Sequence, residues 1–188
     1  MKVVGISGSI VGSKTKAALS LLWEEMVKAY PDAEHVLLDL ADYELQFSDG
    51  RNYLDYPGDT GYVTKQIMQA DILFIGTPIF QASIPGTLKN VFDLLPPQAL
   101  RDKVAGIVVT AGSAKHFLVA EQQLKPILSY MKAHLVSTYV FVEEKDFLNG
   151  KIMNDDVHLR LQRLVEDAFD LAEAQAAVRA KKEAEYDF

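Results

Sequence analysis

Residues 1–15 read MKVVGISGSIVGSKT, and the rest of the chain is organised around them. The apolar run from Lys2 to Ile6 predicts a buried strand, and a loop of small residues and hydroxyls follows it from Ser7 to Thr15. A helical pattern starts directly after the loop, so N–H groups and hydroxyls collect at the positive end of a helix, which suits a phosphate. An ordinary strand-to-helix loop with a capping serine explains the same residues, so both interpretations stay open here.

The length and composition are typical of a single domain with a moderate net charge. The chain has 188 residues, 49% of them hydrophobic, which supports a single domain with a sizeable core. The net charge of −7 argues against a general nucleic-acid-binding surface, which needs a basic patch. The sequence has no cysteine, which excludes disulfides, thiolate metal sites and cysteine nucleophiles, and it shows no other spacing typical of metal ligands.

The hydrophobic segments are short. None approaches the ~20 residues that a membrane-spanning helix needs. The first strand begins at Lys2, so no signal-peptide pattern precedes it. We therefore expect a soluble, cytoplasmic enzyme or binding protein that acts on small molecules, without a membrane or nucleic-acid partner.

Apolar runs and helical patterns alternate along the chain. Strands are predicted at residues 3–6, 35–40, 72–76, 103–110 and 135–142, and helices at residues 13–29, 60–69, 87–95, 115–130 and from 156 onward. This alternation predicts an α/β fold with a parallel sheet, right-handed crossovers and helices on both faces. Residues 41–59 predict a long loop without regular structure. We expect one domain over residues 1–174 and a charged helical extension over residues 175–188.

Three loops are expected to meet at one edge of this sheet, because ligands of such folds bind at the carboxyl ends of the strands. The loops are Ser7 to Thr15, Thr77 to Gly86, and Thr110 to His116. All three are rich in small residues or hydroxyls, and none contains an acidic residue. This chemistry predicts an anion with many oxygens, joined to a flat ring that needs close approach of the backbone.

The second loop predicts contacts with the ring. Pro78 and Pro85 stiffen it, and we expect Ile79, Phe80 and Gln81 to offer backbone N–H and carbonyl groups. The alternative for Phe80 is that its ring packs under the loop.

The third loop places Gly112 and Ser113 on the opposite side of the ring, with His116 as a hydrogen-bond donor; a solvated or core histidine is the alternative. The acidic pair Glu143-Glu144 is interpreted as solvated. No pair of nucleophile and base stands out, so the chemistry is expected to come from a bound cofactor.

Three motifs resemble those of the NADPH-dependent FMN reductases. They are GSIVGSKT (8–15), TPIFQASIPGTLKNVFDLLP (77–96) and TAGSAKHFLVAEQQLKPIL (110–128). Within the family, the chain is most similar to the FMN reductases of alkanesulfonate-utilisation systems. The resemblance extends from Lys2 to about Ala172. It implies a flavodoxin-like three-layer sandwich with a five-stranded parallel sheet in the order 2-1-3-4-5.

The resemblance also implies a function. Such an enzyme transfers a hydride from NADPH or NADH to FMN and then reduces an acceptor, with no catalytic side chain and no metal. The alternatives are an FMN-dependent quinone or azo-dye reductase and a non-enzymatic, flavodoxin-type electron carrier. The family builds its site beside a subunit interface, so a homodimer or homotetramer is expected. The cofactor-binding residues implied are Ser7, Ser9, Ser13, Lys14, Thr15, Pro78, Ile79, Phe80, Gln81, Thr110, Ala111, Gly112, Ser113 and His116.

Two positions depart from the family pattern. Val11 stands where the first loop of the family often carries a basic residue, and Lys14 or Arg51 is a candidate to replace it. Gln122 stands where the sulfonate-system reductases carry a tyrosine that interrupts a helix, so the resemblance does not carry that interruption over to this chain.

Overall fold

A parallel sheet forms the centre of the molecule. The computed structural model describes residues 1–186. The strand order is β2-β1-β3-β4-β5, which confirms the predicted order, and a further short strand, β6, also pairs with β4. The strands are β1 (Lys2–Ser7), β2 (Glu34–Asp39), β3 (Ile72–Pro78), β4 (Val104–Ala111), β5 (His134–Leu135) and β6 (Val140–Glu143). β1, β3 and β4 are almost wholly buried because helices cover both of their faces.

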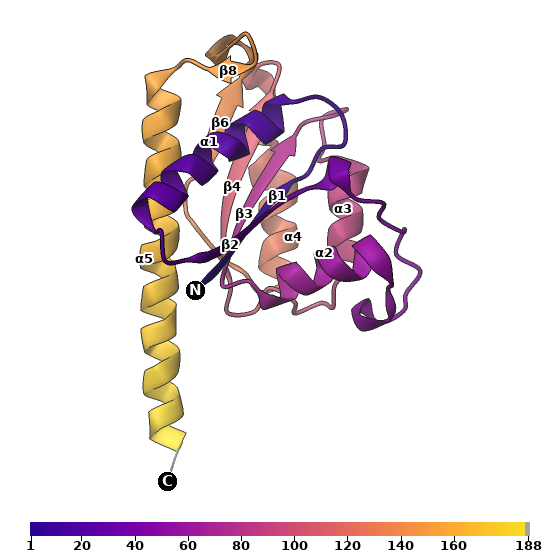
Figure 1. Cartoon of the computed structure of the whole chain (residues 1–188), viewed down its shortest axis with the longest axis vertical. Coiled ribbons are helices and arrows are strands. Elements are labelled where there is room, and N and C mark those ends of the chain that lie inside the picture. The colour runs from indigo at the N-terminus through magenta and orange to yellow at the C-terminus, as the bar shows by residue number, and fades with distance from the viewer. Residues whose placement is uncertain (187–188) are drawn as a thin grey trace.

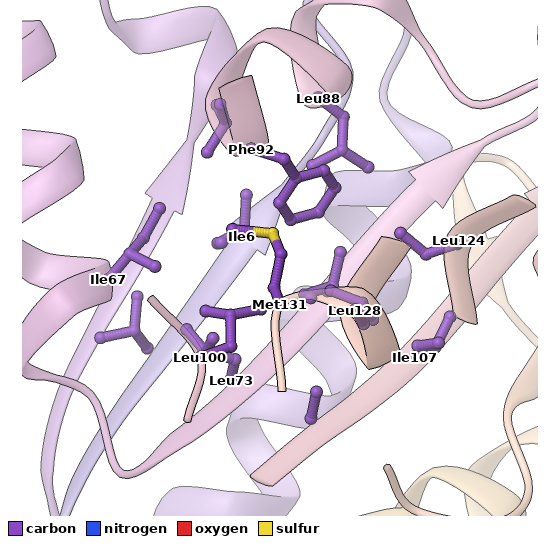
Figure 2. Packing of buried hydrophobic residues seen from close by; sticks show 14 of the residues in the cluster. Ile6, Ile67, Leu73, Leu88, Phe92, Leu100, Ile107, Leu124, Leu128 and Met131 are labelled. Atoms are coloured by element: carbon purple, nitrogen blue, oxygen red, sulfur yellow. The ribbon is translucent and has the colours of Figure 1, made fainter. Parts of the chain in front are cut away.

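The helices form two outer layers. On one face lie α1 (Lys14–Ala29) and α5 (Asp155–Tyr186), and on the other lie α2 (Gly58–Gln69), α3 (Gly86–Asp93) and α4 (Lys125–Tyr130) (Figure 1). Each layer has its own hydrophobic cluster against the sheet. Figure 2 shows Phe92 of α3 and Met131 at the end of α4 pointing toward one another in the second of these layers. These layers fix the ends of the strands and therefore the loops that follow them.

The fifth strand position is not filled by one strand over residues 135–142, as the sequence predicted. The structure has two short strands there, His134–Leu135 and Val140–Glu143, both paired with β4. Between them, the Lys125 ammonium donates to the carbonyl of Ser137 (2.9 Å), so a side chain engages the backbone where the strand is interrupted. This contact comes from another part of the chain, so a local apolar pattern does not reveal it.

The predicted helix over residues 115–130 is likewise divided. A 3-10 turn (η3, Ala114–His116) is followed by a π-helix (η4, Ala120–Leu124) and then by α4. The Lys125 N–H donates to the carbonyl of Ala120, five residues back. Pro126 has no N–H to donate, so regular α-helical bonding cannot continue through this turn. The helix is thus interrupted although Gln122 replaces the tyrosine of the sulfonate-system reductases.

Residues 41–59 are more ordered than the sequence predicted. They contain two 3-10 turns, η1 (Leu40–Asp42) and η2 (Tyr53–Asp55). The buried amide of Asn90 accepts from the Ser48 N–H (3.0 Å) and donates to the Gln46 carbonyl (2.9 Å). The segment is thereby held against α3.

The C-terminal region is a single long helix. α5 extends past the sheet and the other helices (Figure 1). Ala172 is the last buried residue of α5 up to Glu185, and the Arg179 guanidinium still donates to the Asp102 carbonyl (3.0 Å). The expected extension over 175–188 therefore continues α5 as far as Tyr186, and its last two residues lie outside the described range. No helix in the described range is both long and apolar enough to cross a membrane. Before α5 lies a short hairpin of β7 (Phe147–Leu148) and β8 (Lys151–Ile152).

Candidate functional site

A cleft of about 350 Å³ lies at the carboxyl ends of β1, β3, β4 and β6. It brings together the three loops that the sequence predicted to converge. Nine of the predicted residues line it: Ser13, Lys14, Thr15, Pro78, Ile79, Phe80, Thr110, Ala111 and Gly112. Val11, Gly12 and Glu144 complete the lining. The predicted residues outside the lining are Ser7, Ser9, Gln81, Ser113 and His116.

The N-terminus of α1 forms one end of the cleft. Ser13 is its N-cap, is exposed, and makes no side-chain capping bond. The first intrahelical bond runs from the Ala17 N–H to the Ser13 carbonyl (2.8 Å), so the preceding N–H groups of the first turn have no helical acceptor. Gly12 has a φ of +79°, which glycine adopts without strain, and open space surrounds the position of its absent Cβ. The first turn of α1 thus brings N–H groups without a helical acceptor to the lining of the cleft, at the positive end of the helix.

Two buried threonines join the first and third loops. The hydroxyls of Thr15, in α1, and Thr110, near the end of β4, are 2.8 Å apart and hydrogen-bonded. This bond crosses between the two sides of the cleft and fixes the start of α1 relative to β4.

Ser7 and Ser9 are buried and lie outside the lining of the cleft. Ser7 ends β1 and is buried. The Ser9 hydroxyl donates to the Val11 carbonyl (2.6 Å) and accepts from the Val11 N–H (3.2 Å). Ser9 therefore shapes the loop internally.

The second loop turns sharply at its tip. Phe80 and Ser83 exchange two backbone hydrogen bonds of 2.9 Å each. Gln81 and Ala82, between them, have φ values of 46° and 59°, a conformation that costs energy for residues other than glycine. Such strain often occurs at functional sites. From the π-helix, Gln123 accepts from the Ser83 hydroxyl (2.5 Å) and donates to the Ala82 carbonyl (3.1 Å).

This turn changes which backbone groups a ligand can reach. The Ile79 N–H donates to the Thr110 carbonyl (3.2 Å), and the Phe80 N–H and carbonyl are bonded to Ser83. The expectation that these groups are free is therefore wrong for the N–H of Ile79 and for both groups of Phe80. Gln81 keeps both backbone groups free within the described range. The ring of Phe80 is 40% exposed and lines the cleft, so it does not pack under the loop.

The third loop contributes only its first residues. Ala111 and the exposed Gly112 line the cleft, and nothing lies within 4 Å of the position of a Cβ on Gly112. Ser113 precedes the 3-10 turn η3, and His116 ends it, half-buried and outside the lining. The open space at Gly112 suits a flat ligand that lies against the backbone.

Glu144 is the residue that the sequence interpretation missed. Its neighbour Glu143 pairs with Ala111 in the sheet, so Glu144 follows β6 at the same edge as the third loop. Its carboxylate forms an ion pair with the Lys14 ammonium. The position of a fifth strand beside β4 was the signal that could have found it, because the carboxyl ends of parallel strands share one edge.

Lys14, rather than Arg51, brings positive charge to the cleft. The Arg51 guanidinium binds Asp49 and, together with the Tyr56 hydroxyl, holds the pKa of that carboxyl well below its usual range. Arg51 is outside the lining. Of the two candidates for the missing basic residue at Val11, the structure thus places only Lys14 at the site.

Other features of the described residues offer weaker sites. A groove of about 440 Å³ between α3 and α4 is larger, but its lining is mostly apolar and its charged residues, Lys89 and Asp93, bind each other (2.6 Å). It does not lie at the strand ends. The described residues contain no group of three or more His, Asp or Glu side chains that could hold a metal ion.

Comparisons with known proteins agree with this geometry. Residues 1–147 match the family model described as NADPH-dependent FMN reductase. An NAD(P)H-dependent FAD/FMN reductase of Geobacillus thermodenitrificans is 42% identical over 165 residues, covering 87% of this chain and 89% of the relative. The apo structure of an NADH:FMN oxidoreductase is similar with a TM-score of 0.71 and 28% identity, covering 88% of this chain and 86% of that chain. A flavodoxin from Streptococcus pneumonia shares the fold alone, with a TM-score of 0.60, 13% identity and coverage of 90% and 97%.

Proposed function

The chain belongs to the NADPH-dependent FMN reductase family, and we propose that this NAD(P)H-dependent oxidoreductase binds FMN in the cleft between α1 and the loops after β3 and β4. The observation that carries this placement is the convergence of the free N–H groups of α1, the Ser13 hydroxyl and open backbone at Gly112 in one cleft. When bound, FMN supplies the chemistry, because it accepts a hydride from the nicotinamide and passes electrons to an acceptor. The protein binds the flavin, orients it and limits access of water.

The phosphate is assigned to the end of the cleft at α1. Ser13, Lys14 and Thr15 supply a hydroxyl, an ammonium group and a second hydroxyl beside the helix N-terminus. This donor set fits a phosphate, which accepts several hydrogen bonds and carries negative charge. Ser9 acts on this end indirectly, by holding the loop at Val11.

The flavin ring is assigned to the space between the second and third loops. Pro78, Ile79 and the exposed ring of Phe80 form one side, and Ala111 and Gly112 form the other. The backbone groups of Gln81, at the tip of the turn beside Phe80, are assigned to the edge of a ring that extends beyond the cleft. Ser113 and His116 lie further along the third loop and are assigned to this outer part.

A second copy of the chain is expected to cover the mouth of the site. Val11 lines the cleft and is 66% exposed. Its neighbour Ile10 is 54% exposed and lines an apolar hollow together with Phe47, which is 82% exposed. Contiguous exposed apolar side chains are a feature of interaction surfaces. The homodimer or homotetramer expected from the sequence would bury them.

Anaerobic reduction tests the proposed function. The purified protein is mixed with FMN and with NADPH or NADH, and the visible absorbance of oxidised flavin is followed. We expect bleaching with the wild type. We expect little bleaching with Ser13→Asp at limiting FMN, because the new carboxylate repels the phosphate while aspartate remains a good N-cap that keeps α1 folded.

Ser129→Asp is the matched control, because Ser129 is exposed on α4 away from the cleft. It should behave as the wild type. Wild-type protein that bleaches FMN with neither nucleotide contradicts the reductase function. Equal bleaching by Ser13→Asp and the wild type contradicts the placement of the phosphate.

A further inference from the structure

Lys14 occupies an unusual position for a cation. It is the first residue of α1, where the helix dipole is positive and acidic residues are favoured, yet the first turn of α1 contains none. A lysine here does not stabilise the helix. A residue type that is unfavourable at its position in a helix is typical of functional sites. At Lys14 it predicts an anion beside the ammonium group.

In the described structure that anion is Glu144. Lys14 and Glu144 are the two charged residues in the lining of the cleft, and they form an ion pair. Their side chains are 44% and 59% exposed. Exposed pairs of this kind are weak and exchange readily, so another anion can replace the carboxylate.

The neighbouring acidic side chain is held elsewhere. Glu143 binds the Lys145 ammonium (2.7 Å) and accepts from the Asp146 N–H as the cap of the 3-10 turn η5 (Glu144–Asp146). The fold therefore directs Glu143 away from the cleft and leaves Glu144 at Lys14. The two adjacent glutamates provide a matched pair for experiment, because only one of them reaches the site.

We propose that Glu144 competes with the phosphate of FMN for the Lys14 ammonium and thereby weakens FMN binding. The inference rests on the proposed function, because it needs the phosphate at the end of the cleft formed by α1. A phosphate monoester carries a charge of about −1.5 to −2 near neutral pH, so it attracts Lys14 more strongly than a carboxylate does and is repelled by Glu144. An FMN molecule must displace the carboxylate on entry, and Glu144 returns to Lys14 on its release. The pair thus favours a flavin that exchanges over one that stays permanently bound.

Riboflavin has the same ring and ribityl chain as FMN but lacks the phosphate. A comparison of the two flavins therefore separates effects on phosphate binding from effects on binding of the ring and ribityl chain. Dissociation constants for FMN and riboflavin are measured by quenching of flavin fluorescence for the wild type, Glu144→Gln and Glu143→Gln. We expect Glu144→Gln to tighten FMN binding by about two- to fivefold, the range for an exposed ion pair. Riboflavin binding should be unchanged, and Glu143→Gln should leave both constants unchanged.

Removal of Lys14 distinguishes competition from simple repulsion. In the Lys14→Gln background, Glu144→Gln should give less than half of its gain in FMN affinity, because the ammonium group for which both anions compete is absent. A full gain in that background overturns the competition.

Three other results overturn the inference alone. They are unchanged FMN affinity in Glu144→Gln, equal tightening of FMN and riboflavin, and an equal gain in Glu143→Gln. Wild-type protein that binds neither flavin overturns the proposed function, and this inference with it.

Discussion

Ser13 combines two features at the scale of a single residue. Its hydroxyl is exposed at the start of α1, and it makes no capping bond with its own helix. N-cap serines commonly bond to the second or third N–H of the helix, so this hydroxyl remains available to a ligand. Ser13, which the sequence predicted to bind the cofactor, lines the cleft. The sequence could not distinguish Ser13 from Ser9, because the hydrogen bonds between Ser9 and Val11 appear only in the folded loop.

Ser13→Ala should weaken FMN binding by about 1–2 kcal/mol, because one hydrogen bond to a charged group is lost. The free energy of unfolding should change little, since no capping bond is removed. Fluorescence titration and urea unfolding measure the two effects, with Ser129→Ala as the control. Unaltered FMN affinity in Ser13→Ala would place the phosphate elsewhere.

The left-handed backbone at Ala82 predicts an unusual response to glycine. Its φ of 59° is unfavourable for alanine and accessible to glycine. Ala82→Gly should therefore raise the free energy of unfolding by about 0.5–1 kcal/mol, after allowance for the greater entropy of glycine in the unfolded chain.

Ala177→Gly, on the exposed part of α5, should lower the same quantity by about 0.5–1 kcal/mol, because glycine is unfavourable in a helix. Urea unfolding measures both variants. A loss of stability in Ala82→Gly would show that the turn is not strained.

At the scale of elements, the π-helix η4 connects the helical layer to the site. Its residue Gln123 binds the turn at residues 80–83 through two hydrogen bonds. π-helices occur frequently at functional sites, and this one directs a side chain to a loop that lines the proposed flavin site. The sequence did not predict it, because the irregularity needs the proline at 126 and the carbonyl of Ala120 in one turn.

Gln123→Ala should loosen the turn at residues 80–83. Loss of both hydrogen bonds should accelerate amide hydrogen exchange at Phe80 and Ser83 by about fivefold or more, which corresponds to ~1 kcal/mol of local stability. Gln122→Ala is the control, because the Gln122 side chain is exposed and bonds to no other side chain or backbone group in residues 1–186. Equal exchange rates in the two variants would show that Gln123 does not stabilise the turn at residues 80–83.

The predictable elements share one property. β1, β3 and β4 are buried on both faces, so their continuous apolar runs identify them without knowledge of the fold. The interrupted fifth strand and the segment at 41–59 are stabilised by side chains of other elements, such as Lys125 and Asn90. Contacts of this kind cannot be inferred from local periodicity.

At the scale of the whole molecule, the sheet assembles the site from distant parts of the chain. Residues near 13, 79, 111 and 144 meet because parallel strands present their carboxyl ends at one edge. The first three segments were predictable from their small residues and hydroxyls. Glu144 was not, since an acidic pair in a loop is usually solvated and only the pairing of β6 with β4 brings it to the cleft.

The last part of α5 should be dispensable for flavin binding. None of residues 173–185 is buried, and Arg179 donates one hydrogen bond to the body of the protein, at the Asp102 carbonyl. Removal of residues 175–188 should therefore leave the FMN dissociation constant unchanged and lower the free energy of unfolding by less than ~1 kcal/mol.

Light scattering of the full-length and shortened chains measures the assembly. The full-length protein should exceed the mass of one chain, 20.9 kDa, by a factor of two or four at micromolar concentration. A mass of one chain for the full-length protein would contradict the proposed oligomer.

A crystal structure of the protein with FMN would locate both the phosphate and the ring of the flavin. We predict that the phosphate lies within hydrogen-bonding distance of the Ser13 hydroxyl and the free N–H groups of the first turn of α1. The ring should lie between Phe80 and Gly112. A phosphate bound anywhere else, such as in the groove between α3 and α4, would contradict the proposed binding of FMN in the cleft.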